Sequence, residues 1–196
     1  YGPWDFRFMG PAIQGFEATT QGTDFAYSTT NIQVAGIDEA DIVKTDGEYI
    51  YLVSNNSVFI LKAYPPEEAE VLSKITFNDT YPAEIFVGQD KLAVLGCKYD
   101  VPSWQDWYFY GDSETFIYVY DISNKTNPVL TRDFMMSGSY FNSRMIGEYV
   151  YAVISQPAYV ISDKVILPKF YSDDGIKEIE ASKIYYSNVS DNYYTF

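Results

Sequence analysis

The stretch Asp46-Gly47-Glu48-Tyr49-Ile50-Tyr51-Leu52-Val53 is a polar turn followed by an aromatic and apolar strand. Two further strands, Ser57–Leu61 and Val71–Ile75, complete a unit that recurs along the chain. The second copy of the unit contains Gln89–Leu95, Phe116–Tyr120 and Val129–Asp133, and a third copy begins at Gly147–Val153. Aromatic and β-branched side chains favour strands, so the repeated unit predicts an all-β fold.

The spacing of the repeats predicts the architecture. Tyr49 and Lys91 are 42 residues apart, which matches the roughly 40–45-residue blade of a WD40-type β-propeller. Lys91 and Tyr149 are 58 residues apart, because Asp100–Ser113 is inserted between them. The sequence thus predicts antiparallel propeller blades, with about two and a half present. We expect an extended arm at 1–30, blades at 31–80 and 81–137, and an incomplete blade at 138–196.

Alternation along these strands predicts which side chains form the core, because successive strand residues point to opposite faces of a sheet. The predicted core residues are Ile42, Ile50, Leu52, Phe59, Leu61, Ile85, Leu92, Val94, Ile117, Val119, Val150 and Ala152.

The composition excludes several classes of function. The 196 residues carry a formal net charge of −14, with 13 Lys and Arg, so nucleic acid is not an expected partner. The absence of histidine excludes Ser-His-Asp and Cys-His catalysis and any His-ligated metal. Cys97, the single cysteine, allows no intrachain disulfide. No stretch approaches the ~20 apolar residues of a membrane-spanning helix, so membrane insertion is not expected.

The run Thr30–Gly47, Thr-Asn-Ile-Gln-Val-Ala-Gly-Ile-Asp-Glu-Ala-Asp-Ile-Val-Lys-Thr-Asp-Gly, resembles the opening signature of a known family. This family comprises prokaryotic, largely archaeal secreted proteins with a β-propeller domain distantly related to WD40 repeats. Val119–Val129 is similar to the strand-turn-Pro-strand hairpin of surface propeller repeats. The resemblance extends from about Thr30 to the end of the chain. It implies a propeller fold and an extracellular or cell-surface location, and it carries over no functional residue.

An acidic group near the first turn is a candidate calcium site. Calcium takes six to eight oxygen ligands from carboxylates and carbonyls. The alternative interpretation is a strand edge followed by an ordinary Thr-Asp-Gly turn. The candidate ligands are Asp38, Glu39, Asp41 and Asp46. No other cofactor is expected.

The inserted segment is a candidate ligand site, since aromatic faces in a loop can bind sugars or apolar peptide groups. The alternative is that its rings fold back to cap the blade. The candidate binding residues are Trp104, Gln105, Asp106, Trp107, Tyr108 and Tyr110.

Four Asn-x-Ser/Thr triplets favour an extracellular or cell-surface location, because they are acceptor sites for N-glycosylation. They lie at Asn55, Asn78, Asn124 and Asn188. Together these features predict a non-catalytic secreted or cell-surface module that binds a protein or a glycan. The alternative is a carboxylate-based, glycosidase-like hydrolase on the same scaffold, which needs two carboxyls ~5–9.5 Å apart. We also expect self-association, because an incomplete propeller leaves strand edges open.

Overall fold

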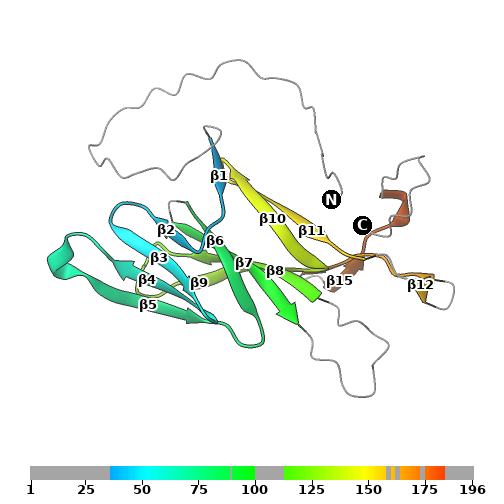
Figure 1. Cartoon of the computed structure of the whole chain (residues 1–196), viewed down its shortest axis with the longest axis horizontal. Helices are drawn as coiled ribbons and strands as arrows, with labels where there is room; N and C mark the ends of the chain where they lie inside the picture. The colour runs from blue at the N-terminus through cyan, green and yellow to red at the C-terminus, as the bar shows by residue number, and fades with distance from the viewer. Residues whose placement is uncertain are drawn as a thin grey trace, which may run out of the picture.

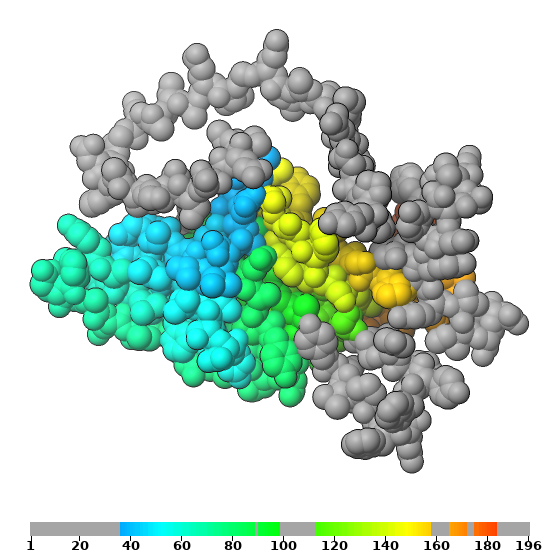
Figure 2. All heavy atoms as spheres, viewed as in Figure 1, coloured from blue at the N-terminus to red at the C-terminus, as the bar shows by residue number. Residues whose placement is uncertain are grey.

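The computed structural model describes residues 36–88, 90–99, 113–157, 160–161, 164–172 and 175–183. These residues form antiparallel strands with two short 3₁₀ turns, at Pro66–Glu68 and Ala181–Lys183. The prediction of an all-β chain with antiparallel sheets is confirmed. Three principal sheets follow one another across the molecule, as Figures 1 and 2 show from cyan through green to yellow.

The first sheet has the strand order β2-β3-β4-β5. Its strands are β2 (Val43–Thr45), β3 (Tyr49–Ser54), β4 (Ser57–Lys62) and β5 (Glu70–Thr76). The turn between β3 and β4 is tight, and Asn55 adopts a positive φ of 53° there. Asparagine tolerates this left-handed conformation better than most residues, which explains why the hairpin closes at this point.

The second sheet contains β6 (Tyr81–Gly88), β7 (Lys91–Tyr99), β8 (Ser113–Asp121) and β9 (Val129–Ser137). Two later strands, β14 (Lys169–Ser172) and β15 (Gly175–Glu178), extend it through pairing of β14 with β9. The predicted boundary at residue 138 therefore does not separate the sheets completely. Residues 169–178 were expected in the third blade, but their backbone hydrogen bonds join them to the outer edge of the second sheet.

The third sheet contains β10 (Ser139–Ile146), β11 (Tyr149–Ser155) and, unexpectedly, β1 (Ile37–Glu39). A separate hairpin consists of β12 (Val160–Ile161) and β13 (Lys164–Val165). The segment from β1 to β2 crosses the inner strands of all three sheets. It pairs first with β10, then through Asp41 with Ile85 of β6, and finally with β3. Residues 37–45, which belong to the run that resembles the family's opening signature, thus connect the three sheets through backbone pairing with β10, β6 and β3.

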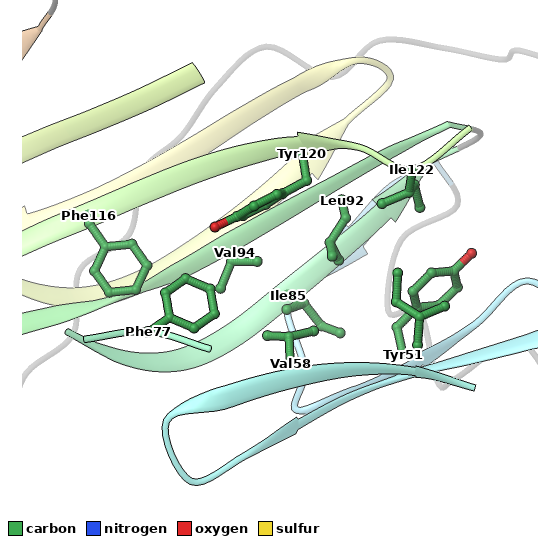
Figure 3. Close-up of a cluster of buried hydrophobic side chains, with 10 residues drawn as sticks. Tyr51, Val58, Phe77, Ile85, Leu92, Val94, Phe116, Tyr120 and Ile122 are labelled. Carbon is green, nitrogen blue, oxygen red and sulfur yellow. The ribbon is translucent and has the colours of Figure 1, made fainter. Parts of the chain in front are cut away.

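The larger core cluster fills the space between the first and second sheets (Figure 3). Tyr51, Val58 and Ile60 of the first sheet face the second sheet and are fully buried. A smaller cluster, with Phe86, Ala93 and Leu95 at its centre, lies on the opposite face of the second sheet and packs against β10 and β11. The second sheet is therefore apolar on both faces and lies between the other two.

The core prediction is correct for the second sheet and wrong for the first. Ile85, Leu92 and Val94 are fully buried, whereas Ile42 is 55% exposed. Ile50, Leu52, Phe59 and Leu61 are only partly buried. They alternate with Tyr51, Val58 and Ile60, so they lie on the face that points away from the second sheet. The predicted members that pack around the smaller cluster are Ile117, Val119, Val150 and Ala152.

Candidate functional site

Each of the three sheets contains one equivalent hairpin: β2-β3 in the first, β6-β7 in the second and β10-β11 in the third. These hairpins share one register, so their residues can be compared position by position. Each hairpin pairs residues five positions apart: Thr45 with Ile50, Val87 with Leu92, and Met145 with Val150. Three alternate positions on β3, β7 and β11 are therefore equivalent, and in the first two sheets they lie on the face toward the next sheet. They hold Tyr49, Tyr51 and Val53 in the first sheet, Lys91, Ala93 and Leu95 in the second, and Tyr149, Tyr151 and Val153 in the third.

In the interface between the first and second sheets, tyrosines fill these positions. Tyr51 is fully buried and extends toward Ile122, which directly follows β8 of the second sheet (Figure 3). Its hydroxyl donates a hydrogen bond of 2.7 Å to Asp46 Oδ2, and burial raises its pKa well above the usual value. Lys125 Nζ, from the second sheet's loop, lies 5.6 Å from the Tyr49 ring and 5.9 Å from the Tyr51 ring. This interface is closed by aromatic packing.

In the interface between the second and third sheets, a cleft of about 1020 Å³ lies where the tyrosines would be. The second sheet has Lys91 and Ala93 at these positions, so the ring that Tyr51 supplies in the first interface is missing. The cleft is lined by Phe86, Gly88, Asp90, Lys91, Ala93, Val119, Asp121, Ser123, Thr131, Arg132, Met145, Gly147, Glu148 and Val150. Its volume is close to the upper limit for small-ligand sites, about 1,000 Å³.

One wall of the cleft is a row of side chains across the second sheet. The strand register places Phe86, Ala93, Val119 and Arg132 opposite one another on β6, β7, β8 and β9. Met145 and Val150 form the aliphatic wall on the third sheet. The apolar side chains of the two walls together form the floor of the cleft, and the guanidinium group of Arg132 lies at the end of the row.

The charges around the cleft differ in how they are engaged. Lys91 Nζ lies 2.6 Å from Asp121 Oδ2. The bonds from Lys91 and Ser123 hold the pKa of the Asp121 carboxyl well below its usual range. Within the described residues, no hydrogen bond or ion pair engages the side chains of Asp90, Arg132 and Glu148. These three groups are therefore available to a ligand.

The predicted acidic residues have separate structural roles. Asp38 Oδ1 lies 2.7 Å from Lys44 Nζ, and Glu39 Oε1 lies 3.0 Å from Arg144 of β10. Asp46 Oδ1 accepts the backbone N–H groups of the turn, and Asp41 Oδ1 accepts the N–H of the next residue. No group of three or more potential metal ligands is found within the described residues. Calcium binding by this segment stays a prediction.

The other predicted sites fall partly outside the described residues. The aromatic candidates Trp104, Gln105, Asp106, Trp107, Tyr108 and Tyr110 all lie there, as does Asn188. Asn55, Asn78 and Asn124 are exposed and lie in turns or bends. Their exposure is compatible with glycosylation, which stays a prediction.

The comparisons with known proteins identify the family. The model of the β-propeller domain family matches residues 27–196, and the chain therefore belongs to this family. An uncharacterized protein of Methanocaldococcus jannaschii is 30% identical over 128 residues, which is 65% of this chain and 17% of that protein. An uncharacterized protein of Archaeoglobus fulgidus is 26% identical, over 83% of this chain and 25% of its own length.

The chain thus spans a quarter or less of these two relatives. No solved structure matches the chain. Among the residues that the structure describes, no helix is long and apolar enough to cross a membrane.

Sequence reasoning missed the residues of the cleft, although the repeat contained a signal for them. Aligned by turn, Tyr49-Ile50-Tyr51 and Tyr149-Val150-Tyr151 share a Tyr-x-Tyr pattern that Lys91-Leu92-Ala93 breaks. The repeat alignment placed Lys91 opposite Tyr49 and Tyr149, but this position was used only for the repeat spacing. Only the pairing of the sheets shows that both changes fall on one interface.

Proposed function

We propose that this chain is a non-catalytic secreted or cell-surface interaction module that binds a protein through the cleft between its second and third sheets. The carrying observation is the combination of an apolar floor with three charged groups that have no partner in the described structure. Concave sites with apolar walls and a few well-placed polar groups are typical of ligand binding. The propeller scaffold supports this role, because it holds both walls of the cleft on regular strands.

The chemistry of the floor favours a protein over a glycan at this site. Sugars commonly stack on exposed aromatic rings, whereas Phe86, the one aromatic side chain among the described residues of the cleft, is 1% exposed. The accessible floor is aliphatic, through Val119, Met145 and Val150, and it suits an apolar peptide side chain. Glycan binding stays a prediction for the aromatic segment at residues 104–110.

The hydrolase alternative receives little support from the cleft. A glycosidase needs a carboxylic acid with a raised pKa to protonate the leaving group. Asp121 has the opposite property, because Lys91 and Ser123 stabilise its ionised form. Turnover of a glycoside that is lost on substitution of Asp90 or Glu148 would establish the alternative.

Two further parts of the proposal concern the extracellular setting. Exposed acceptor asparagines support secretion, and mass spectrometry of the protein from its native source tests whether they carry glycans. Calcium at Asp38, Glu39, Asp41 and Asp46 is tested by calorimetry with calcium and EDTA. The ion pairs of Asp38 and Glu39 compete with metal binding, so any affinity is expected to be weak, and heat at millimolar calcium supports a site.

The test of protein binding is a peptide display library screened against the wild-type protein and an Ala93→Tyr variant. The variant places a ring at the position that is equivalent to Tyr51, so it should fill the cleft and reduce peptide capture at least tenfold. Ala93 is 7% exposed, and circular dichroism must therefore show that the variant keeps the wild-type fold. Val71→Tyr is the matched control, since Val71 is 57% exposed on β5. Arg132→Glu, at the exposed rim, is a second variant that should alter the selected sequences without disturbing the fold. Peptides that bind all variants equally would overturn the proposal.

A second proposal concerns self-association, which exposed apolar side chains on the third sheet favour. Phe141 is 74% exposed, Tyr149 72%, Tyr151 57% and Val153 58%. Among the described strands, β11 pairs with β10 alone, so its other edge is a template for pairing. Light scattering should show concentration-dependent dimers that Tyr149→Lys weakens. A strict monomer at high concentration would contradict this proposal.

A further inference from the structure

We infer that the cleft recognises a tyrosine ring together with a nearby carboxylate, both presented by the partner protein. This inference rests on the proposed function and names the chemical group that the site takes. Its basis is internal to the chain, since the first interface shows how this scaffold binds a tyrosine between two sheets.

The walls that would hold the ring match those around Tyr51. By the shared register, Leu92 and Val87 of the second sheet correspond to Val150 and Met145 of the third. Leu92 and Val87 belong to the cluster that packs around Tyr51, and Val150 and Met145 line the cleft. An aromatic ring above Ala93 would therefore meet aliphatic side chains at the same positions of the repeat. Burial of a ring of this size is the main source of affinity at such sites.

The ring hydroxyl also has candidate acceptors in the cleft. In the first interface Asp46 accepts the hydrogen bond from Tyr51. Gly88 is the equivalent of Asp46 in the second sheet, so it supplies no carboxylate. Asp90 and Glu148 line the same cleft and have no hydrogen bond or ion pair within the described residues. Either carboxylate can take the role of Asp46, since a buried hydroxyl requires a partner.

The carboxylate of the ligand is assigned to Arg132. Ala93 pairs with Val119, and Val119 pairs with Arg132, so Ala93 and Arg132 are separated by two strand spacings of about 4.8 Å each. A ring that rests on Ala93 and Val119 thus leaves its backbone side near the guanidinium. Arginine binds carboxylates in a bidentate geometry, and the Arg132 side chain has no competing ion pair in the described structure.

Small probes test this inference without an identified partner. 3-(4-Hydroxyphenyl)propionate carries the ring and the carboxylate, its amide lacks the charge, and tyramine replaces the anion with a cation. We expect the propionate to bind at roughly millimolar concentration, as ligand efficiency allows for so few atoms. The amide and tyramine should bind about tenfold more weakly, because they lose the charge-assisted bonds to Arg132.

NMR titration of protein variants with the same probes tests whether the probes bind in the cleft. Arg132→Gln should bring the propionate to the level of the amide. Ala93→Tyr should abolish binding of the propionate and the amide, and Val71→Tyr should leave the binding of both unchanged. Tyramine that binds more tightly than the propionate, or equal binding of all three probes, would overturn the inference, as would no binding at about 5 mM. Library peptides that Ala93→Tyr blocks but that lack an aromatic-acidic preference would overturn it while the proposed function stands.

Discussion

The two interfaces of the second sheet have the same register but different contents. Toward the first sheet, the repeat positions hold Tyr49 and Tyr51, and Tyr51 is fully buried under the second sheet. Toward the third sheet, the same positions hold Lys91 and Ala93, and a cleft of about 1020 Å³ remains. The hairpins share one register, and the side chains at the equivalent positions differ in volume and charge.

This comparison shows how a repeat scaffold can acquire a site without a change of fold. The strands and turns keep the sheets in place, while the loss of two rings opens one interface to a ligand. The filled interface should therefore contribute mainly to stability, and the open one mainly to binding.

The largest expected change in the free energy of unfolding comes from a substitution in the filled interface between the first and second sheets. Tyr51→Ala removes a fully buried ring, and it should lower the free energy of unfolding by about 3–5 kcal/mol, as large-to-small aromatic changes in cores do. Tyr151→Ala is the matched control, because Tyr151 occupies the equivalent position and is 57% exposed. Its effect should stay within about 0.5 kcal/mol. Urea unfolding followed by circular dichroism measures both, and equal losses would break the comparison.

The second sheet itself offers a sharper test, since it contains glycines on its filled and open sides. A Cβ added at Gly96 would lie 2.1 Å from the carbonyl oxygen of Tyr81 and 2.8 Å from the Phe116 ring. Gly96→Ala should therefore destabilise the protein by about 1–3 kcal/mol, the usual cost of overpacking. Gly88, which lines the cleft, has nothing within 4 Å of an added Cβ. Gly88→Ala should be close to neutral, and a comparable loss there would show that the cleft is tightly packed.

A smaller effect is expected from one hydroxyl group. Tyr51→Phe keeps the ring but leaves Asp46 without the hydrogen bond of 2.7 Å. The loss should be about 1 kcal/mol, the typical net contribution of an internal hydrogen bond. Tyr151→Phe should have no measurable effect. If Tyr51→Phe is as stable as the wild type, the packing of the ring, and not the hydrogen bond to Asp46, stabilises this interface.

The smallest predicted effect appears only at alkaline pH. Burial raises the pKa of Tyr120, a member of the filled interface, from 10.0 to about 12. The unfolded chain releases this proton at lower pH than the folded chain does, so the folded state binds more protons above pH 10. Stability due to Tyr120 is therefore complete below pH 10 and is lost as the pH rises toward about 12. Tyr120→Phe should flatten this alkaline decline by roughly 1 kcal/mol at pH 11, measured by urea unfolding at several pH values.

The sequence by itself determined the class of fold and most of its strands. The aromatic-apolar repeats and their turns predicted antiparallel sheets, and β3, β4, β7 and β8 lie where the repeat places them. Local preference for strands and turns acts between near neighbours, and it can be read without knowledge of the rest of the chain. The acidic character and the absence of histidine likewise limited the chemistry in advance.

The tertiary structure decided which face of each sheet is buried. Both faces of the first sheet carry apolar side chains, so alternation could not distinguish Ile50 and Leu52 from Tyr51. Packing against the second sheet selects the face with Tyr51. The same holds for Asp38 and Glu39, whose ion pairs with Lys44 and Arg144 depend on a crossing between sheets.

Long-range pairing also decided where β1 and β14 lie and where the cleft opens. β1 pairs with β10, which lies more than a hundred residues later in the sequence. β14 pairs with β9, although the third sheet's strands β10 and β11 lie between them in the sequence. The cleft requires Ala93, Arg132 and Val150 to meet, although they come from three separate strands of two sheets. Such proximity arises only when the sheets pack, because the hydrophobic effect buries apolar area without regard to distance along the chain.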